Sequence, residues 1–132
     1  QRRALALRDQ LPDPADRALS HNNLALYLEA SGTTAALAEA PGHLLADLAY
    51  CLAAGLGQSL QTSFRNYVNV FRRARAAGTG PDIPRLAALL ADPGFAALAP
   101  WLRQRRIDPA ALQADIDAFL DQAREAASDA AD

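Results

Sequence analysis

Apolar residues recur at intervals of three and four positions along two long segments of the chain, from 58 to 77 and from 109 to 128. The first stripe consists of Leu60, Phe64, Val68 and Phe71 with Tyr67 alongside, and the second of Leu112, Ile116, Phe119, Leu120 and Ala123. This spacing places each set on one side of an α-helix. We therefore predict two amphipathic helices that each bury one face.

Aspartate-proline pairs mark the start of three helical segments, at Asp13-Pro14, Asp92-Pro93 and Asp108-Pro109. The carboxylate can accept hydrogen bonds from free amides of the first turn, and proline suits the first helical position because its missing N–H costs nothing there. Pro84 is expected to open a further helix. The helices are expected to end at glycines, which occupy positions 32, 55, 57, 78 and 80.

These signals predict an all-α fold of about six helices, without β-strands. Pro41-Gly42 should either kink the segment from 34 to 54 or split it into 34–40 and 42–54, and Pro100 should bend or divide the segment from 93 to 104. Residues 127–132 are expected to fray. The full map comprises helical segments at 2–10, 14–30, 34–54, 58–77, 84–91, 93–104 and 109–128.

The stretch from Ala18 to Gly32 carries an asparagine-leucine-alanine core, a tyrosine-leucine pair and a closing glycine, at Asn23-Leu24-Ala25, Tyr27-Leu28 and Gly32, and Ala36-Leu37 follows. This pattern resembles the first helix of a tetratricopeptide repeat (TPR) and the start of its partner. The resemblance implies that small residues let the paired helices approach, that Tyr27 or Leu28 fills the gap between them, and that glycine makes the turn. We expect a TPR-like hairpin over residues 14–54.

No second copy of this pattern follows at a period of about 34 residues. The resemblance therefore implies one degenerate helical repeat followed by a nonrepetitive bundle, similar to the C-terminal region of a longer bacterial TPR-containing protein. Because an isolated repeat cannot bury its own faces, we expect residues 1–132 to form one domain. Its later parts are an amphipathic basic helix over 58–77 and a C-terminal helical cap over 84–128.

Charge is distributed unevenly, although the chain as a whole carries a net charge of only −2. All 13 basic residues are arginines; residues 57–106 contain eight of them against two aspartates, whereas residues 107–132 contain one against seven carboxylates. Two interpretations remain open: the acidic tail folds onto the basic middle, or the two surfaces face different partners.

A polar cluster, Ser20-His21-Asn22-Asn23, interrupts the apolar pattern of the first hairpin helix. Four consecutive residues cover all sides of a helix, so at least one must point inward or into a groove. One interpretation is that Asn23 makes an internal hydrogen bond while its neighbours face solvent. The other is that His21 or Asn22 lines a ligand groove, since TPR proteins commonly present first-helix side chains to a bound peptide.

On the helix from 58 to 77, an exposed stripe is expected opposite the apolar one, formed by Gln61, Arg65, Asn69 and Arg72, with Asn66 and Arg73 on its flank. Guanidinium groups interleaved with amides suit a carboxylate or a phosphate. Two other interpretations stay open. The stripe is simply a solvated face, or it pairs with an acidic line on the last helix, formed by Asp117, Asp121 and Glu125.

The sequence favours a noncatalytic protein-protein interaction or scaffold module, located in the cytoplasm, that recognises an acidic segment or a carboxylate of a protein or peptide partner. The proposed binding residues are His21, Asn22, Arg65, Asn69, Arg72 and Arg73. No catalytic set, metal site or cofactor site is expected, because the two histidines and Cys51 show no catalytic or metal-ligating spacing and Cys51 is expected to be buried. No apolar run is long enough to cross a membrane.

Two alternatives of other classes remain. A nucleic-acid-binding module would use the arginine clusters at 72–75 and 103–106, the second of which adjoins Trp101. Trp101 is nevertheless expected to anchor the core at a helix junction. A purely structural cap of a repeat array would have no partner outside its own chain.

Overall fold

The computed structural model describes residues 14–80 and 83–131, with side chains to residue 128. The helix predicted near 2–10 and the Asp13 cap lie outside these residues. The described part contains no β-strand, which confirms the all-α fold of about six helices. Its elements are α2 (Pro14–Ser31), α3 (Thr34–Ala54), α4 (Gly57–Ala76), α5 (Leu86–Ala91), the 3₁₀ turn η1 (Pro93–Phe95), α6 (Leu98–Gln104) and α7 (Pro109–Ala131).

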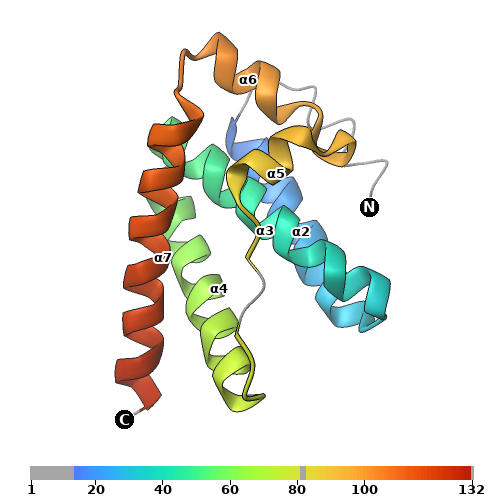
Figure 1. Ribbon diagram of the computed structural model, residues 1–132, viewed down its shortest axis with the longest axis vertical. Helices are drawn as coiled ribbons and strands as arrows, with labels where there is room; N and C mark the ends of the chain where they lie inside the picture. Colours follow the sequence, from blue (N-terminus) through green and yellow to red (C-terminus); the bar gives the residue numbers. More distant parts are fainter. Residues whose placement is uncertain (1–13, 81–82, 132) are drawn as a thin grey trace.

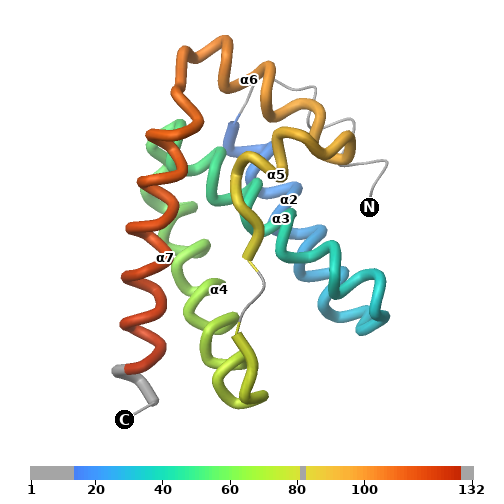
Figure 2. The backbone as a smooth tube through the Cα atoms, in the orientation of Figure 1, coloured from blue at the N-terminus to red at the C-terminus, as the bar shows by residue number. Residues whose placement is uncertain are grey.

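The helices form two pairs that diverge from a common end (Figure 1). α2 and α3 make a hairpin, and α4 lies beside α7, with both of these helices running in the same direction (Figure 2). The pairs are joined at Gly55, which ends α3 in the left-handed conformation at φ 68°. α5 and α6 lie across the joined end.

The hairpin turn follows from two residues. Gly32 takes a φ of 70°, a value that glycine adopts without steric cost. The hydroxyl of Thr33 then accepts a hydrogen bond from the backbone N–H of Ala36 at 3.1 Å, which caps the start of α3. The turn therefore follows the predicted glycine stop directly.

α3 is one helix from Thr34 to Ala54, although Pro41 lies inside it. Of the two predictions for this segment, the split into two helices is wrong. Proline removes one backbone hydrogen bond, but α3 is packed along its length against α2, its most extensive neighbour. Gly42 allows the ring of Phe95 to approach α3 closely, because a Cβ atom at this position would lie only 3.0 Å from that ring.

Three boundaries differ from the sequence prediction, and at the first of them a distant residue intervenes. α5 begins at Leu86 rather than at Pro84, and the side chain of Gln113 on α7 accepts the Leu86 amide hydrogen at 2.7 Å. The segment from 93 to 104 divides before Pro100, which then occupies the first turn of α6. The C-terminus does not fray at residue 127, since Ala127 is buried and α7 continues to Ala131.

The two predicted apolar stripes meet each other. Phe64 and Tyr67 of α4 pack edge-on against Phe119 of α7, with ring centroids 5.7 and 6.3 Å apart. At the joined end, Trp101 is buried and packs edge-on against Tyr50 of α3 at 4.8 Å, as expected for a core anchor. The core is therefore built around α3 and extends between α4 and α7.

The resemblance to a TPR stays a prediction. Leu24, Ala25 and Leu28 are buried against α3, but Tyr27 is 55% exposed, so Leu28 rather than Tyr27 fills the helix gap. In the described residues no second hairpin of this kind follows α3, because α4 pairs with α7 instead. None of the helices described is long and apolar enough to span a membrane.

Arg106 is the one described residue other than glycine with a positive φ, at 57°, directly after α6. The left-handed conformation costs such a residue about 1–2 kcal/mol. We expect Arg106→Gly to raise the free energy of unfolding by about 0.5–1 kcal/mol, measured by urea denaturation. The same change at Arg103, which is helical, should lower it by about 1 kcal/mol; equal effects at both positions would contradict the assignment of strain.

Candidate binding groove

A surface groove lies between the second half of α2 and the exposed side of α4. It has a volume of about 280 Å³ and is called here the α2–α4 groove; its walls are Leu26, Glu29, Leu44, Asn66, Asn69, Arg72 and Arg73. The α4 residues repeat at intervals of three and four, which is why one helix face supplies both amides and guanidinium groups. The groove carries two arginines against one carboxylate, so it has one net positive charge.

Three of the six predicted binding residues, Asn69, Arg72 and Arg73, lie together in this groove. Asn22 stands next to it: its side-chain oxygen accepts a hydrogen bond from the amide of Asn66 at 2.6 Å, which ties α2 to α4. Arg65 is exposed on the same helix, two turns before Arg72, and does not line the groove.

His21 does not belong to the groove, because its side chain is only 1% exposed. Its Nδ1 lies 2.9 Å from Nδ1 of His43, and its ring stacks on Phe95 at 5.6 Å. The prediction that Asn23 supplies the internal hydrogen bond is wrong, since Asn23 is exposed and Asn22 takes that role. Periodicity alone did not fix the rotation of α2 about its axis.

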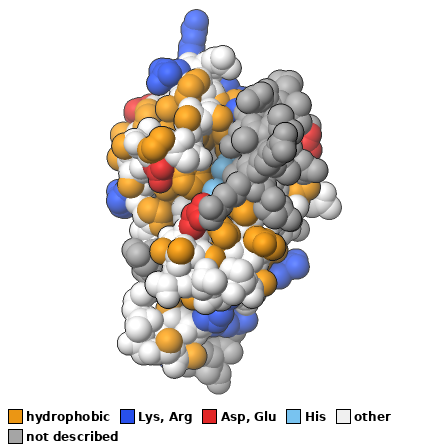
Figure 3. Space-filling view, turned by 90° about the vertical axis from the view of Figure 1, so that its right-hand side faces the viewer, with side chains coloured by type: hydrophobic (Ala, Val, Ile, Leu, Met, Phe, Trp, Pro, Cys, Tyr) orange, Lys and Arg blue, Asp and Glu red, His pale blue; other side chains and the backbone are white. Residues whose placement is uncertain are grey.

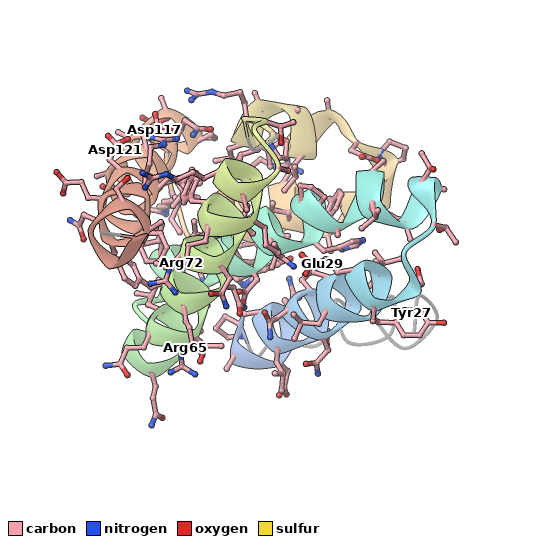
Figure 4. All side chains as sticks on the ribbon, turned by 90° about the horizontal axis from the view of Figure 1, so that it is seen from below. Tyr27, Glu29, Arg65, Arg72, Asp117 and Asp121 are labelled. Carbon is pink, nitrogen blue, oxygen red and sulfur yellow. The ribbon has the colours of Figure 1, made fainter. Side chains whose placement is uncertain are left out.

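Glu29 was missed by the sequence analysis. Glu29 belongs to α2 and lies on the side of this helix that faces α4 in Figure 4. Tyr27 points away near the end of the hairpin. The Glu29 carboxylate accepts a hydrogen bond from Arg73 at 3.2 Å, and the two form an ion pair across 44 positions of sequence. An exposed pair of this kind contributes about 0–1 kcal/mol, so its main effect is to neutralise part of the charge of the groove.

The acidic line of α7 shows no ion pair with the arginines of α4 in the described residues. Asp117 accepts a hydrogen bond from Arg85 at 3.1 Å, and Asp121 pairs with Arg124 on its own helix at 2.9 Å. Of the interpretations left open for the arginine stripe, pairing with the acidic line of α7 is not found in the described residues, and the two helices meet through aromatic side chains instead.

The two arginine clusters considered for nucleic-acid binding lie at opposite ends of the molecule. Residues 72–75 are near the free end of α4, whereas residues 103–106 end α6 at the joined end (Figure 1). Arg105 lies over the ring of Trp101 at 4.6 Å. Figure 3, which views the side of the hairpin, likewise shows arginines at separate places on that face. These clusters do not form one continuous surface.

A second polar group is enclosed in the core around Asp47, which is 4% exposed. Ser63 of α4 donates to one carboxylate oxygen at 2.6 Å, and Cys51 donates to the other at 3.5 Å. Burial raises the pKa of Asp47 to about 6, although the hydrogen bonds from Ser63 and Cys51 and the charge of His21 oppose this shift.

This buried group is not arranged as a nucleophile site. The hydroxyl and the thiol both donate to Asp47 rather than to a histidine. Burial, followed by the charge of Asp47, raises the pKa of Cys51 to about 12, so its thiol stays protonated at neutral pH. Within the described ranges, no three histidine, cysteine or acidic side chains converge as a metal site would require.

No protein-family model matches this sequence, and neither a curated protein nor a solved structure shows significant similarity to it. The functional argument therefore depends on the geometry of the groove.

Asp47 makes the stability of the protein depend on pH in a defined direction. Its folded-state pKa, about 6, lies above the ordinary value of 3.8 for an aspartate, so its contribution to stability is present below about pH 4 and is lost as pH rises through 6. We expect the stability of Asp47→Asn relative to the wild type to rise with pH over this range, by about 1–3 kcal/mol between pH 4 and pH 7. Urea denaturation from pH 4.5 to 7 measures the difference.

The exposed Asp115→Asn serves as the control for this prediction and should show no such trend. A difference between Asp47→Asn and the wild type that does not change with pH would mean that burial leaves the pKa of Asp47 at its ordinary value.

Proposed function

We propose that the protein is a noncatalytic interaction module that recognises an acidic segment or a free carboxylate of a protein partner through the α2–α4 groove. The observation that carries this proposal is the composition of the groove: Asn66, Asn69, Arg72 and Arg73 line it, and Glu29 is its one carboxylate. One added carboxylate would neutralise the remaining positive charge.

The chemistry of the four α4 side chains supports this ligand class. A guanidinium group presents N–H donors in a fixed planar fork that matches a carboxylate, and the asparagine amides can bind a peptide backbone as donors and acceptors. Asn66 is already oriented by its hydrogen bond to Asn22. Arg72 is exposed and forms no ion pair with any residue that the structure describes. Its charge is therefore available to solvent or to a ligand.

In this proposal the hairpin is a degenerate TPR unit within a longer bacterial protein of the cytoplasm, in which it serves as a scaffold element. The TPR-like pattern of residues 18–32 and the groove beside that helix support the same role. The absence of any binding would instead favour a structural cap, and binding of nucleic acid that declines steeply with salt would favour the arginine clusters.

Charge reversal at Arg72 tests the proposal. A random 12-residue phage-displayed peptide library selected on the chain should yield sequences with an acidic residue or terminus. Arg72→Glu should weaken their binding about 10- to 100-fold, because a hydrogen bond to a charged group is lost and a repulsive charge is gained. Fluorescence anisotropy measures the affinity, and circular dichroism checks the fold.

The matched control is Arg75→Glu, which makes the same charge change on the same helix at an exposed position outside the groove. Arg65→Glu should have an intermediate effect if the ligand extends along α4. An equal loss of peptide affinity with Arg75→Glu would indicate that the peptides are attracted by overall charge. That result would contradict binding in the α2–α4 groove.

Glu29→Gln should strengthen the binding of acidic peptides. Removing this carboxylate leaves Arg73 without its present ion pair and raises the net charge of the groove from one to two. We expect the same acidic peptides to bind about 3- to 10-fold more tightly, with a steeper dependence on salt. Weaker binding to Glu29→Gln would mean that the carboxylate is itself a ligand contact.

A further inference from the structure

The outer side of α7 is an acidic face, called here the α7 face. Up to residue 128, this helix carries four carboxylates and one arginine, namely Asp115, Asp117, Asp121, Glu125 and Arg124. Asp117 pairs with Arg85 and Asp121 pairs with Arg124. Glu125 is exposed and forms no ion pair with any residue that the structure describes. The α7 face therefore keeps negative charge that the described part of the chain does not neutralise.

α4 carries the complementary charge. It contains no carboxylate and four arginines, all of them exposed: Arg65, Arg72, Arg73 and Arg75. Among the described residues, Arg73 has an ion-pair partner in Glu29, whereas Arg72 has none. Arg72 lines the α2–α4 groove. Arg72 and Glu125 are thus two exposed side chains of opposite charge that the described fold leaves without an ion pair.

These two charges point in different directions within one chain. Ile116 of α7 is fully buried in the core that lies between α7, α3 and α4. Glu125 follows Ile116 by nine positions, which is about two and a half turns of an α-helix, so the two side chains lie on opposite sides of α7. Glu125 therefore points away from α4, and the groove it can reach belongs to another molecule.

The α7 face also permits close approach of another helix. Ala118 and Ala114 share the side of α7 that carries Glu125, because they precede it by seven and eleven positions, and both are exposed. The distance between packed helices falls as the side chains at the contact become smaller. The α2–α4 groove presents Leu26, which is 46% exposed, beside its arginines. An α7 helix laid along the groove would cover this leucine with alanine side chains while its carboxylates meet guanidinium groups.

We propose that the acidic segment recognised by the α2–α4 groove is the α7 face of a second copy of this chain, with Glu125 of the second copy bound to Arg72. The inference rests on the proposed function and names its partner. Because the two surfaces differ, the contact is either exchanged within a two-fold dimer or repeated head-to-tail from copy to copy. Exposed ion pairs are screened by salt, so this self-association is weak and strongest at low ionic strength.

Sedimentation velocity of the wild-type chain tests the inference. At about 0.02 M salt the average mass should rise with protein concentration, and at about 0.5 M salt it should return to that of one chain. Arg72→Glu and Glu125→Arg should each weaken self-association about tenfold or more, because each brings two like charges together. The control is Arg103→Glu at an exposed position of α6, which makes the same change in net charge as Arg72→Glu and should leave self-association unchanged.

The double variant Arg72→Glu/Glu125→Arg distinguishes a direct contact from an effect of overall charge. It keeps the wild-type net charge of −2 and exchanges the two charges across the contact. We expect its self-association to return to within about threefold of the wild type, and an equimolar mixture of the two single variants to associate as well. Failure of both the double variant and the mixture to associate would contradict the pairing of Arg72 with Glu125.

The outcomes also separate this inference from the proposed function. A chain that stays monomeric at low salt, yet binds the phage-selected acidic peptides and loses them with Arg72→Glu, would overturn the second copy as partner and leave the groove intact. Self-association that is unaffected by Arg72→Glu would overturn the second copy in the same way. Absence of both self-association and peptide binding would overturn both proposals. Self-association that the acidic peptides compete away would support both.

Discussion

The structure depends on the burial of the second half of α3 on all sides. Every residue from His43 to Cys51 is buried, and α2, α4, α5 and α7 each contact this helix. A helix without a solvated face must hold its polar residues inside the core. This is why His43 and Asp47 have hydrogen-bonding neighbours on α2 and α4.

Local rules predicted much of the helix map. The apolar stripes placed α4 and α7, and Gly55, Asp92 and Asp108 supplied the predicted caps or stops. These features depend on neighbours within a few residues along the chain, so local sequence patterns are enough to predict them. By contrast, the start of α5 depends on Gln113, which is 27 positions away, and no local pattern reveals such a partner.

The same distinction applies to the candidate site. Asn69, Arg72 and Arg73 could be grouped in advance because they share one face of one helix. Their opposite wall, Glu29, required knowledge of how the helices pack. Complementary charge was a poor guide to that packing: Arg124 of the acidic helix lies over the ring of Phe71 at 4.8 Å. Apolar contact between α4 and α7 outweighs exposed ion pairs of about 0–1 kcal/mol.

Gly55 joins the two helix pairs at one end of the molecule, and the pairs diverge toward the other end. Between α2 and α4, the Asn66–Asn22 hydrogen bond and the exposed Arg73–Glu29 ion pair connect the two pairs. A segment bound in the α2–α4 groove would contact both α2 and α4 and would hold the two helix pairs together. Binding would then restrict movement of the hairpin relative to α4, which would be detectable as slower amide hydrogen exchange along α2.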